Sequence, residues 1–189
     1  MLFRSVAGAL AQAGRWDDAR AVAETIAYPR ERAEALGDVA GALAAAGQWE
    51  EAQRTFAGAR AVAAAIADPR ERAEALGDVA GALAAGQWEE ARAVAEVIAD
   101  PEQRARALRE VADVLAQARR WDDARAVAET IADPFWRAEA LREVAGALAA
   151  GQWEEARAVA AAIADPFWRA EALGDVAGEI GRASCRERV

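Results

Sequence analysis

Adjacent carboxylates are the residues of this 189-residue chain whose type and spacing come closest to those of catalytic groups. Two such groups can act as general acid and general base when both face one substrate. Neighbouring residues on a helix do not face each other, however. The pairs also recur, each directly after a tryptophan: Trp16-Asp17-Asp18-Ala19, Trp49-Glu50-Glu51-Ala52, Trp88-Glu89-Glu90-Ala91, Trp121-Asp122-Asp123-Ala124 and Trp153-Glu154-Glu155-Ala156. We therefore interpret them as charges that stabilise helix N-termini, and not as catalytic groups.

Other site chemistries are excluded by composition. The chain has no histidine and one cysteine, Cys185. It therefore holds no Cys/His zinc site, no Ser-His-Asp triad, no Cys-His dyad and no disulfide. No glycine-rich phosphate loop and no metal-ligand spacing occurs in the sequence. We expect no catalytic residue, no cofactor, no metal and no enzymatic activity.

The charge and the hydropathy of the chain limit which partners and which cellular compartment we expect. The formal net charge is −9, and every cation is an arginine. An acidic chain without lysine lacks the clustered cations that phosphate contacts need, so we expect no nucleic-acid partner. No apolar run is long enough to span a membrane, and no signal segment opens the chain. The sequence thus predicts a cytoplasmic protein with no membrane partner.

The tryptophan motifs mark an internal repeat. A proline follows each of them at a constant distance, except in the second copy, which carries the additional residues Gln53 to Ala59. That insertion is about two helical turns long, so it should lengthen one helix without rotating its apolar face. Low-complexity disorder is the alternative for so alanine-rich a chain. It fails because leucine, valine, isoleucine and tryptophan recur at fixed positions.

Each repeat contains two amphipathic helix patterns. The first begins at Asp-Pro, a favourable N-cap and first helical residue, and ends near a glycine such as Gly86. The second begins at the tryptophan and ends before the next Asp-Pro. The pattern predicts an all-α chain of eleven helices in stacked antiparallel hairpins. They are a truncated first helix, five tryptophan-led second helices, and first helices near 30–46, 70–85, 102–118, 135–150 and 167–178.

These residues resemble the tetratricopeptide repeats. Leu36, Val39, Ala40, Leu43, Gly47, Trp49 and Ala52 fall at the family's signature positions, and the proline that ends each unit matches as well. The resemblance covers residues 2–178. It implies a right-handed α-solenoid, a superhelix that binds partner proteins along a concave face lined by the first helices. Another solenoid type, such as a HEAT-like array, stays open.

Carried over by position, the resemblance places partner-binding residues on the first helices. The early positions are acidic with small neighbours, which would suit a basic or extended peptide, and the later positions are mixed. Ordinary solvated helix faces are the alternative interpretation. The candidate residues are Glu34, Asp38, Glu74, Asp78, Arg106, Arg109, Glu110, Asp113, Glu139, Arg142 and Glu143.

Two further sets of residues stand out. An arginine recurs at the fourth position of every first helix, at Arg32, Arg72, Arg104, Arg137 and Arg169. We favour a structural role for it over a carboxylate clamp, through the acids after each tryptophan or through its aliphatic stem. Phe-Trp pairs occur only in the last two units and either anchor a partner or connect consecutive turns: Phe135, Trp136, Phe167 and Trp168. The five turn tryptophans should be core or hairpin anchors.

The repeat pattern stops at Gly178. Residues 179–189 match no unit and read as a translated short-read sequencing adapter, whose next codon in this frame is a stop. We expect this segment, with Cys185, to be non-native. Residues 1–178 would then form a single array of five hairpins and one unpaired helix, truncated at both ends. The composition fits a fragment from a GC-rich bacterial genome.

The sequence therefore predicts a non-enzymatic scaffold that binds a protein or peptide, and the acidic early positions favour a basic one. Two alternatives stay open. In the first, the array is the repeat segment of a larger bacterial regulator or enzyme whose active domain lies elsewhere. In the second, the array self-associates through its uncapped ends.

Overall fold

The computed structural model describes residues 2–84, 86–149 and 151–186. Within these ranges the chain is an all-helical repeat solenoid without strands, as the sequence predicts. Its eleven described helices are α1 (Leu2–Gln12), α2 (Trp16–Glu24), α3 (Pro29–Ala45), α4 (Trp49–Ala64), α5 (Pro69–Ala84), α6 (Trp88–Glu96), α7 (Pro101–Gln117), α8 (Trp121–Thr130), α9 (Pro134–Ala149), α10 (Trp153–Ala161) and α11 (Pro166–Arg186).

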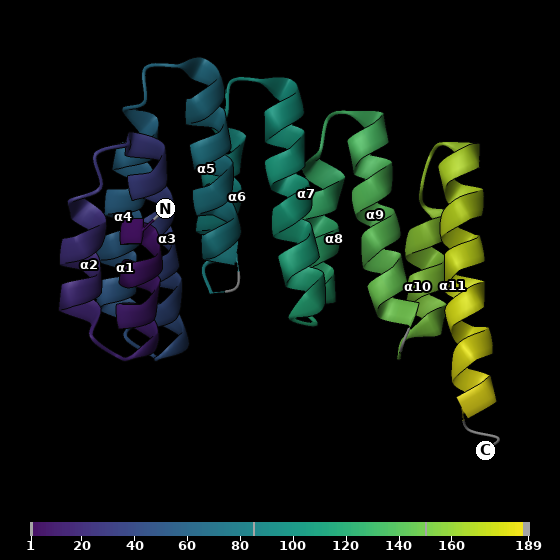
Figure 1. Cartoon of the computed structure of the whole chain (residues 1–189). Coiled ribbons are helices and arrows are strands. Elements are labelled where there is room, and N and C mark those ends of the chain that lie inside the picture. Colours follow the sequence, from purple (N-terminus) through teal and green to yellow (C-terminus); the bar gives the residue numbers. More distant parts are fainter. Residues whose placement is uncertain (1, 85, 150, 187–189) are drawn as a thin grey trace. The chain divides into compact units, whose positions relative to one another are not determined.

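The helices fall into two compact units, residues 1–107 and 108–189, which divide within α7. In the first unit, each first helix packs against its hairpin partner and α3 also contacts α1 and α5 (Figure 1). In the second unit, α9 packs against α8, α10 and α11. The prediction of one continuous array over residues 1–178 stays a prediction.

The core is built from small side chains at helical spacing. Alanines such as Ala40 and Ala80 are fully buried between helices, together with Val79, Leu83 and Ile98. Alanine favours helix and lets helix axes approach closely. The alanine content thus reflects packing between hairpins.

The first helices begin as the Asp-Pro signal predicts. Oδ1 of Asp68 accepts hydrogen bonds from the backbone N–H groups of Arg70 and Glu71, each over 2.9 Å. Asp133 and Asp165 cap α9 and α11 in the same way. Each cap satisfies two N–H groups that have no partner inside the helix. The start of every capped first helix is therefore fixed by its own sequence.

The hairpin turns differ in a way that the sequence only partly predicts. Gly47 adopts φ 77°, and the backbone N–H of Gln48 bonds to the carbonyl of Leu43 over 2.9 Å, which completes a Schellman motif. Arg119 takes the same left-handed conformation, with φ 60°. Helix α5 ends near Gly86, as predicted, but neither Gly86 nor its equivalent Gly151 has a positive φ. The repeats that contain these glycines lack one alanine before the turn. There the backbone N–H of Gln87 bonds to the carbonyl of Leu83, four residues earlier, and Gln152 bonds to Leu148 in the same way, whereas the bond at Gly47 spans five residues.

Two helices are longer than their counterparts in the other repeats. The insertion Gln53 to Ala59 extends α4 to 16 residues, against 9 in α6 and α10. The next first helix, α5, still begins at its proline, Pro69. It also adds the buried side chains Thr55 and Phe56. Helix α11 continues through residue 186, beyond the expected end near 178. The helical backbone does not test the adapter origin of residues 179–189, which stays a prediction.

No helix in the described ranges combines the length and the apolar character that a membrane crossing requires.

Candidate partner-binding face

The predicted binding residues of α3 form ion pairs with α1, the first helix of the preceding repeat. Arg4 on α1 pairs with Glu34, and its Nε donates to Oδ2 of Asp38 over 3.2 Å. Gly37 on the same helix is buried, and a Cβ there would lie 3.5 Å from the Cβ of Ala82 on α5. Gly37 therefore belongs to the α3–α5 contact.

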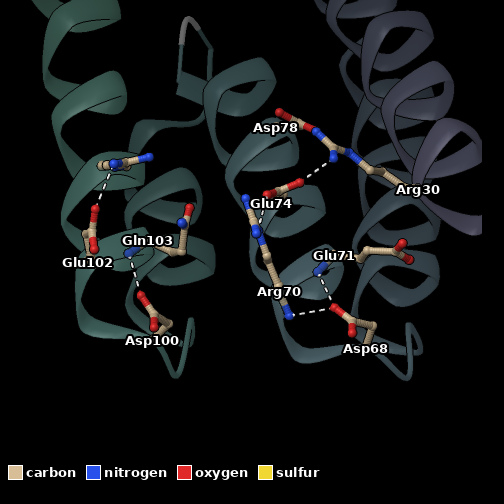
Figure 2. A network of polar contacts seen from close by, with 10 residues as sticks. Arg30, Asp68, Arg70, Glu71, Glu74, Asp78, Asp100, Glu102 and Gln103 are labelled. Carbon is tan, nitrogen blue, oxygen red and sulfur yellow. Dashed lines mark hydrogen bonds and ion pairs between the residues drawn. The ribbon is translucent and has the colours of Figure 1, made fainter.

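The same kind of ion pairing occurs one repeat later, between α3 and α5 (Figure 2). Arg30 on α3 pairs with Glu74 and lies 3.7 Å from Asp78, both on α5. Arg70 also approaches Glu74, with 3.2 Å between Nε and Oε1. The two acids of α5 are thus matched by two arginines. The acidic positions expected on α5 are therefore present, and arginines neutralise them.

In the second unit, Arg109 of α7 links two predicted residues of α9. Its Nη1 donates to Oε1 of Glu143 over 2.6 Å, and its Cζ lies 5.8 Å from the ring centroid of Trp136. A guanidinium over an indole face is a cation–π contact. One arginine is therefore held by a ring and a carboxylate together.

Other acids of this unit have no such partner. In the described part of the chain, Glu110 and Glu139 form no ion pair, and Asp113 accepts only from the Gln117 amide, over 2.8 Å. Although Glu110 is exposed by area, desolvation of its carboxyl raises its pKa, with Arg109 opposing and Asp113 adding to the rise. Desolvation also raises the pKa of Glu143, together with the charges of Asp113 and Glu139 and against that of Arg109. The excess of carboxylates therefore lies on the later first helices.

The remaining predicted arginines are engaged as well. Arg142 on α9 lies 2.9 Å from Asp175 and 3.6 Å from Glu171, both on α11. Arg106 pairs with Glu102 of its own helix over 2.7 Å. Both arginines therefore already have carboxylate partners within the chain.

The Phe-Trp pairs form one aromatic ladder, which we define as Trp136, Phe135, Trp168 and Phe167. Neighbouring rings meet edge to face, with centroids 5.1 Å, 5.3 Å and 5.3 Å apart in that order. The Phe135–Trp168 contact joins α9 to α11, so the interpretation that these residues connect consecutive turns is confirmed. Phe135 and Phe167 nevertheless remain 45% and 63% exposed. The two exposed rings are connected through the ladder, which distinguishes them from exposed apolar side chains that are scattered singly.

The turn tryptophans are not core residues, contrary to one of the two interpretations. Trp49 and Trp153 are 52% and 49% exposed, and Trp16, Trp88 and Trp121 are only partly buried. Trp49 instead covers the next hairpin turn, since a Cβ on Gly86 would lie 3.2 Å from its ring. The carboxylates after each tryptophan lie in the first helical turn, as expected, and some form local pairs such as Arg20–Asp17 at 3.0 Å.

Two notches at equivalent places in the repeat were not predicted from the sequence. One, of about 310 Å³, lies between the start of α5 and the loop before α7; its lining includes Arg70, Leu76, Ile98 and Gln103. The other, of about 290 Å³, lies at the same place between α9 and α11 and is lined by Leu141 and Ile163 among others. Phe135 and Trp168 occupy the repeat positions of Arg70 and Gln103. The change from polar to aromatic residues between these repeats is the sequence feature that distinguishes the two notches.

No group of side chains suited to a metal ion occurs among the described residues.

Comparisons with known proteins add no functional assignment. No family model matches the chain, and no curated protein matches it. One similar solved structure is the crystal structure of Ton1535 from Thermococcus onnurineus NA1. It is 14% identical in sequence, and the match covers 92% of this chain and 89% of that chain with a TM-score of 0.44. A likeness at this level carries no argument about function.

Proposed function

We propose that the chain is a non-enzymatic, tetratricopeptide-like scaffold that binds a partner polypeptide on its first helices. The observation that carries the proposal is the aromatic ladder. Its rings are fixed by edge-to-face contacts, while Phe135 and Phe167 remain open to solvent. Aromatic side chains held in place lose little entropy on binding and are frequent anchors of protein interfaces.

The repeat architecture supports the same proposal. First helices held side by side present equivalent positions at regular intervals, which suits an extended polypeptide. The caps at Asp133 and Asp165 and the turn bonds fix where these helices begin and end. The ladder is therefore carried by rigid elements and needs little ordering on binding.

Selection from a random peptide display library, followed by calorimetry on the selected peptides, tests the proposal. The double variant Phe135→Ala/Phe167→Ala should weaken binding at least about tenfold, since an aromatic anchor contributes more than about 1 kcal/mol. Trp153→Ala is the matched control, because Trp153 has similar exposure on the second helix α10. Selected peptides that bind the double variant as tightly as the unaltered protein would contradict the proposal.

A further inference from the structure

The contact between Arg109 and Trp136 shows how this surface holds a guanidinium group. The arginine lies 5.8 Å from the ring centroid, and its Nη1 is 2.6 Å from Glu143. The ring supplies its negative face and the carboxylate supplies a charged acceptor. Together they form a two-part arginine site within the chain itself.

The sequence repeats the aromatic and acidic components of this site one repeat later, where Arg142 takes the place of Arg109 and lies 3.6 Å from Glu171. Phe135-Trp136 is followed by Glu139, and Phe167-Trp168 is followed by Glu171 at the same spacing. Residues three and four apart lie on the same helix face. Each ring pair therefore has a carboxylate beside it on its own helix.

The charges of the second unit complement a cationic partner. Its candidate binding positions and their equivalents on α11 hold six carboxylates against Arg109 and Arg142, while Arg137 and Arg169 of the same helices bond to turn carbonyls. The carboxylates are Glu110, Asp113, Glu139, Glu143, Glu171 and Asp175. In the first unit, by contrast, arginines match the acids of α3 and α5. After desolvation by burial, the negative charge of Asp113 also contributes to the raised pKa of Glu110 and of Glu143.

We propose that the aromatic ladder and the neighbouring carboxylates of Glu110, Asp113 and Glu139 bind a peptide segment containing arginine. The proposal rests on the proposed function and names the chemistry of its partner. Arginine side chains stack on the exposed rings of Phe135 and Phe167, and the carboxylates accept their N–H groups. The negative charge also accelerates the encounter with a basic segment.

Fluorescence anisotropy with a labelled peptide of alternating arginine and leucine tests this assignment. Two peptides of the same length serve as probes of the charge, one with citrulline and one with glutamate in place of arginine. We expect the arginine peptide to bind, and the citrulline peptide, which keeps the shape without the charge, to bind at least about tenfold more weakly. The glutamate peptide should not bind, and added salt should weaken the arginine peptide.

The protein variants locate the site. Phe135→Leu/Phe167→Leu keeps apolar bulk in the ladder but removes the π faces, so it should weaken binding without unfolding the chain. Glu139→Gln and Glu110→Gln should each weaken it about two- to fivefold. Glu154→Gln, on the second helix α10, is the matched control and should leave affinity unchanged. Equal binding of the arginine peptide to all of these variants would overturn the proposal.

The outcomes also separate this proposal from the one on which it rests. Tight binding of the citrulline or glutamate peptide that is lost in Phe135→Ala/Phe167→Ala would overturn the arginine assignment and leave the scaffold function standing. If no peptide, selected or designed, depends on Phe135 and Phe167, both proposals fail.

Discussion

Nη1 of Arg72 donates a hydrogen bond of 2.8 Å to the backbone carbonyl of Ile66, six residues earlier. Arg104, Arg137 and Arg169 make the same bond to the isoleucine of their own turns, over 3.1 Å, 3.1 Å and 3.4 Å. The bond satisfies a carbonyl at the end of the preceding second helix, where helical partners run out. At these four positions the recurrent arginine is thus structural, as predicted, but its partner is this carbonyl and not the acids after tryptophan.

The repeated Arg–carbonyl bond should contribute measurably to stability. We expect Arg72→Met, which keeps the aliphatic stem and removes the donor, to lower the free energy of unfolding by about 1–2 kcal/mol. Arg70→Met, two residues earlier on α5, removes only an exposed ion pair with Glu74 and should cost less than about 1 kcal/mol. Urea denaturation measures both. Equal losses would show that the carbonyl bond has no special weight.

The turn at Arg119 should be improvable by a single substitution. A residue with a side chain at φ 60° is strained by about 1–2 kcal/mol, partly offset by the entropy that glycine adds to the unfolded chain. Arg119→Gly should therefore raise the free energy of unfolding by about 1 kcal/mol. Gly47→Ala should lower it by a similar amount.

Gly151→Ala is the control for the turn prediction. Gly151 has no positive φ, and nothing lies within 4 Å of a Cβ added there, so the substitution should not destabilise the chain. If all three substitutions had the same sign in thermal or chemical melts, backbone conformation would not explain the turns.

The insertion in α4 should be removable as one piece. Deleting Gln53 to Ala59 leaves the sequence Trp-Glu-Glu-Ala-Arg-Ala-Val-Ala-Ala, which is identical to α10. We expect a cooperatively melting helical protein with a shorter α4. Because Phe56 is only 4% exposed, the deletion should also cost about 3–5 kcal/mol, as burial of this ring is lost. Circular dichroism during heating would contradict this by showing a gradual, non-cooperative loss of helix.

The raised pKa of Glu110 predicts a pH dependence with a definite sign. The folded chain binds this proton more tightly than the unfolded chain, whose ordinary value is 4.5. The free energy of unfolding therefore falls as pH rises from 4.5 through the raised pKa. Glu110→Gln removes that loss, so the variant should be more stable than the unaltered protein at pH 7, with the difference closing below pH 4.5.

A second variant identifies the cause of the shift at Glu110. Asp113→Asn removes a nearby negative charge and should lower the pKa of both Glu110 and Glu143. Carboxyl-detected nuclear magnetic resonance titration follows the two groups directly. An unchanged pKa at both sites would show that Asp113 does not influence them.

Most of the fold could be predicted from the sequence because its signals are local. Asp133 with Pro134 determines where α9 begins, and helical spacing of the apolar residues determines which face is buried. Even the length of α4 follows from counting the inserted residues. The burial of Phe56 was not predicted, since it depends on what the added turns of α4 pack against.

The candidate site was predicted less completely because its properties depend on contacts between helices. Arg30 lies 44 residues before Glu74, and only the register of α3 against α5 brings them together. The sequence therefore identified the acids of α5 but not their neutralisation. Phe135 and Trp168 were recognised as unusual, whereas their mutual contact required the packing of α9 against α11.

Site-specific photo-crosslinking tests the central claim most directly. A photoreactive phenylalanine analogue would replace Phe135 in one protein and Trp153 in another, two aromatic positions of similar exposure on a first and a second helix. With the peptide of alternating arginine and leucine, we expect crosslinking at position 135 and none above background at position 153. Crosslinking at position 153 alone, or at both positions equally, would contradict binding on the first helices.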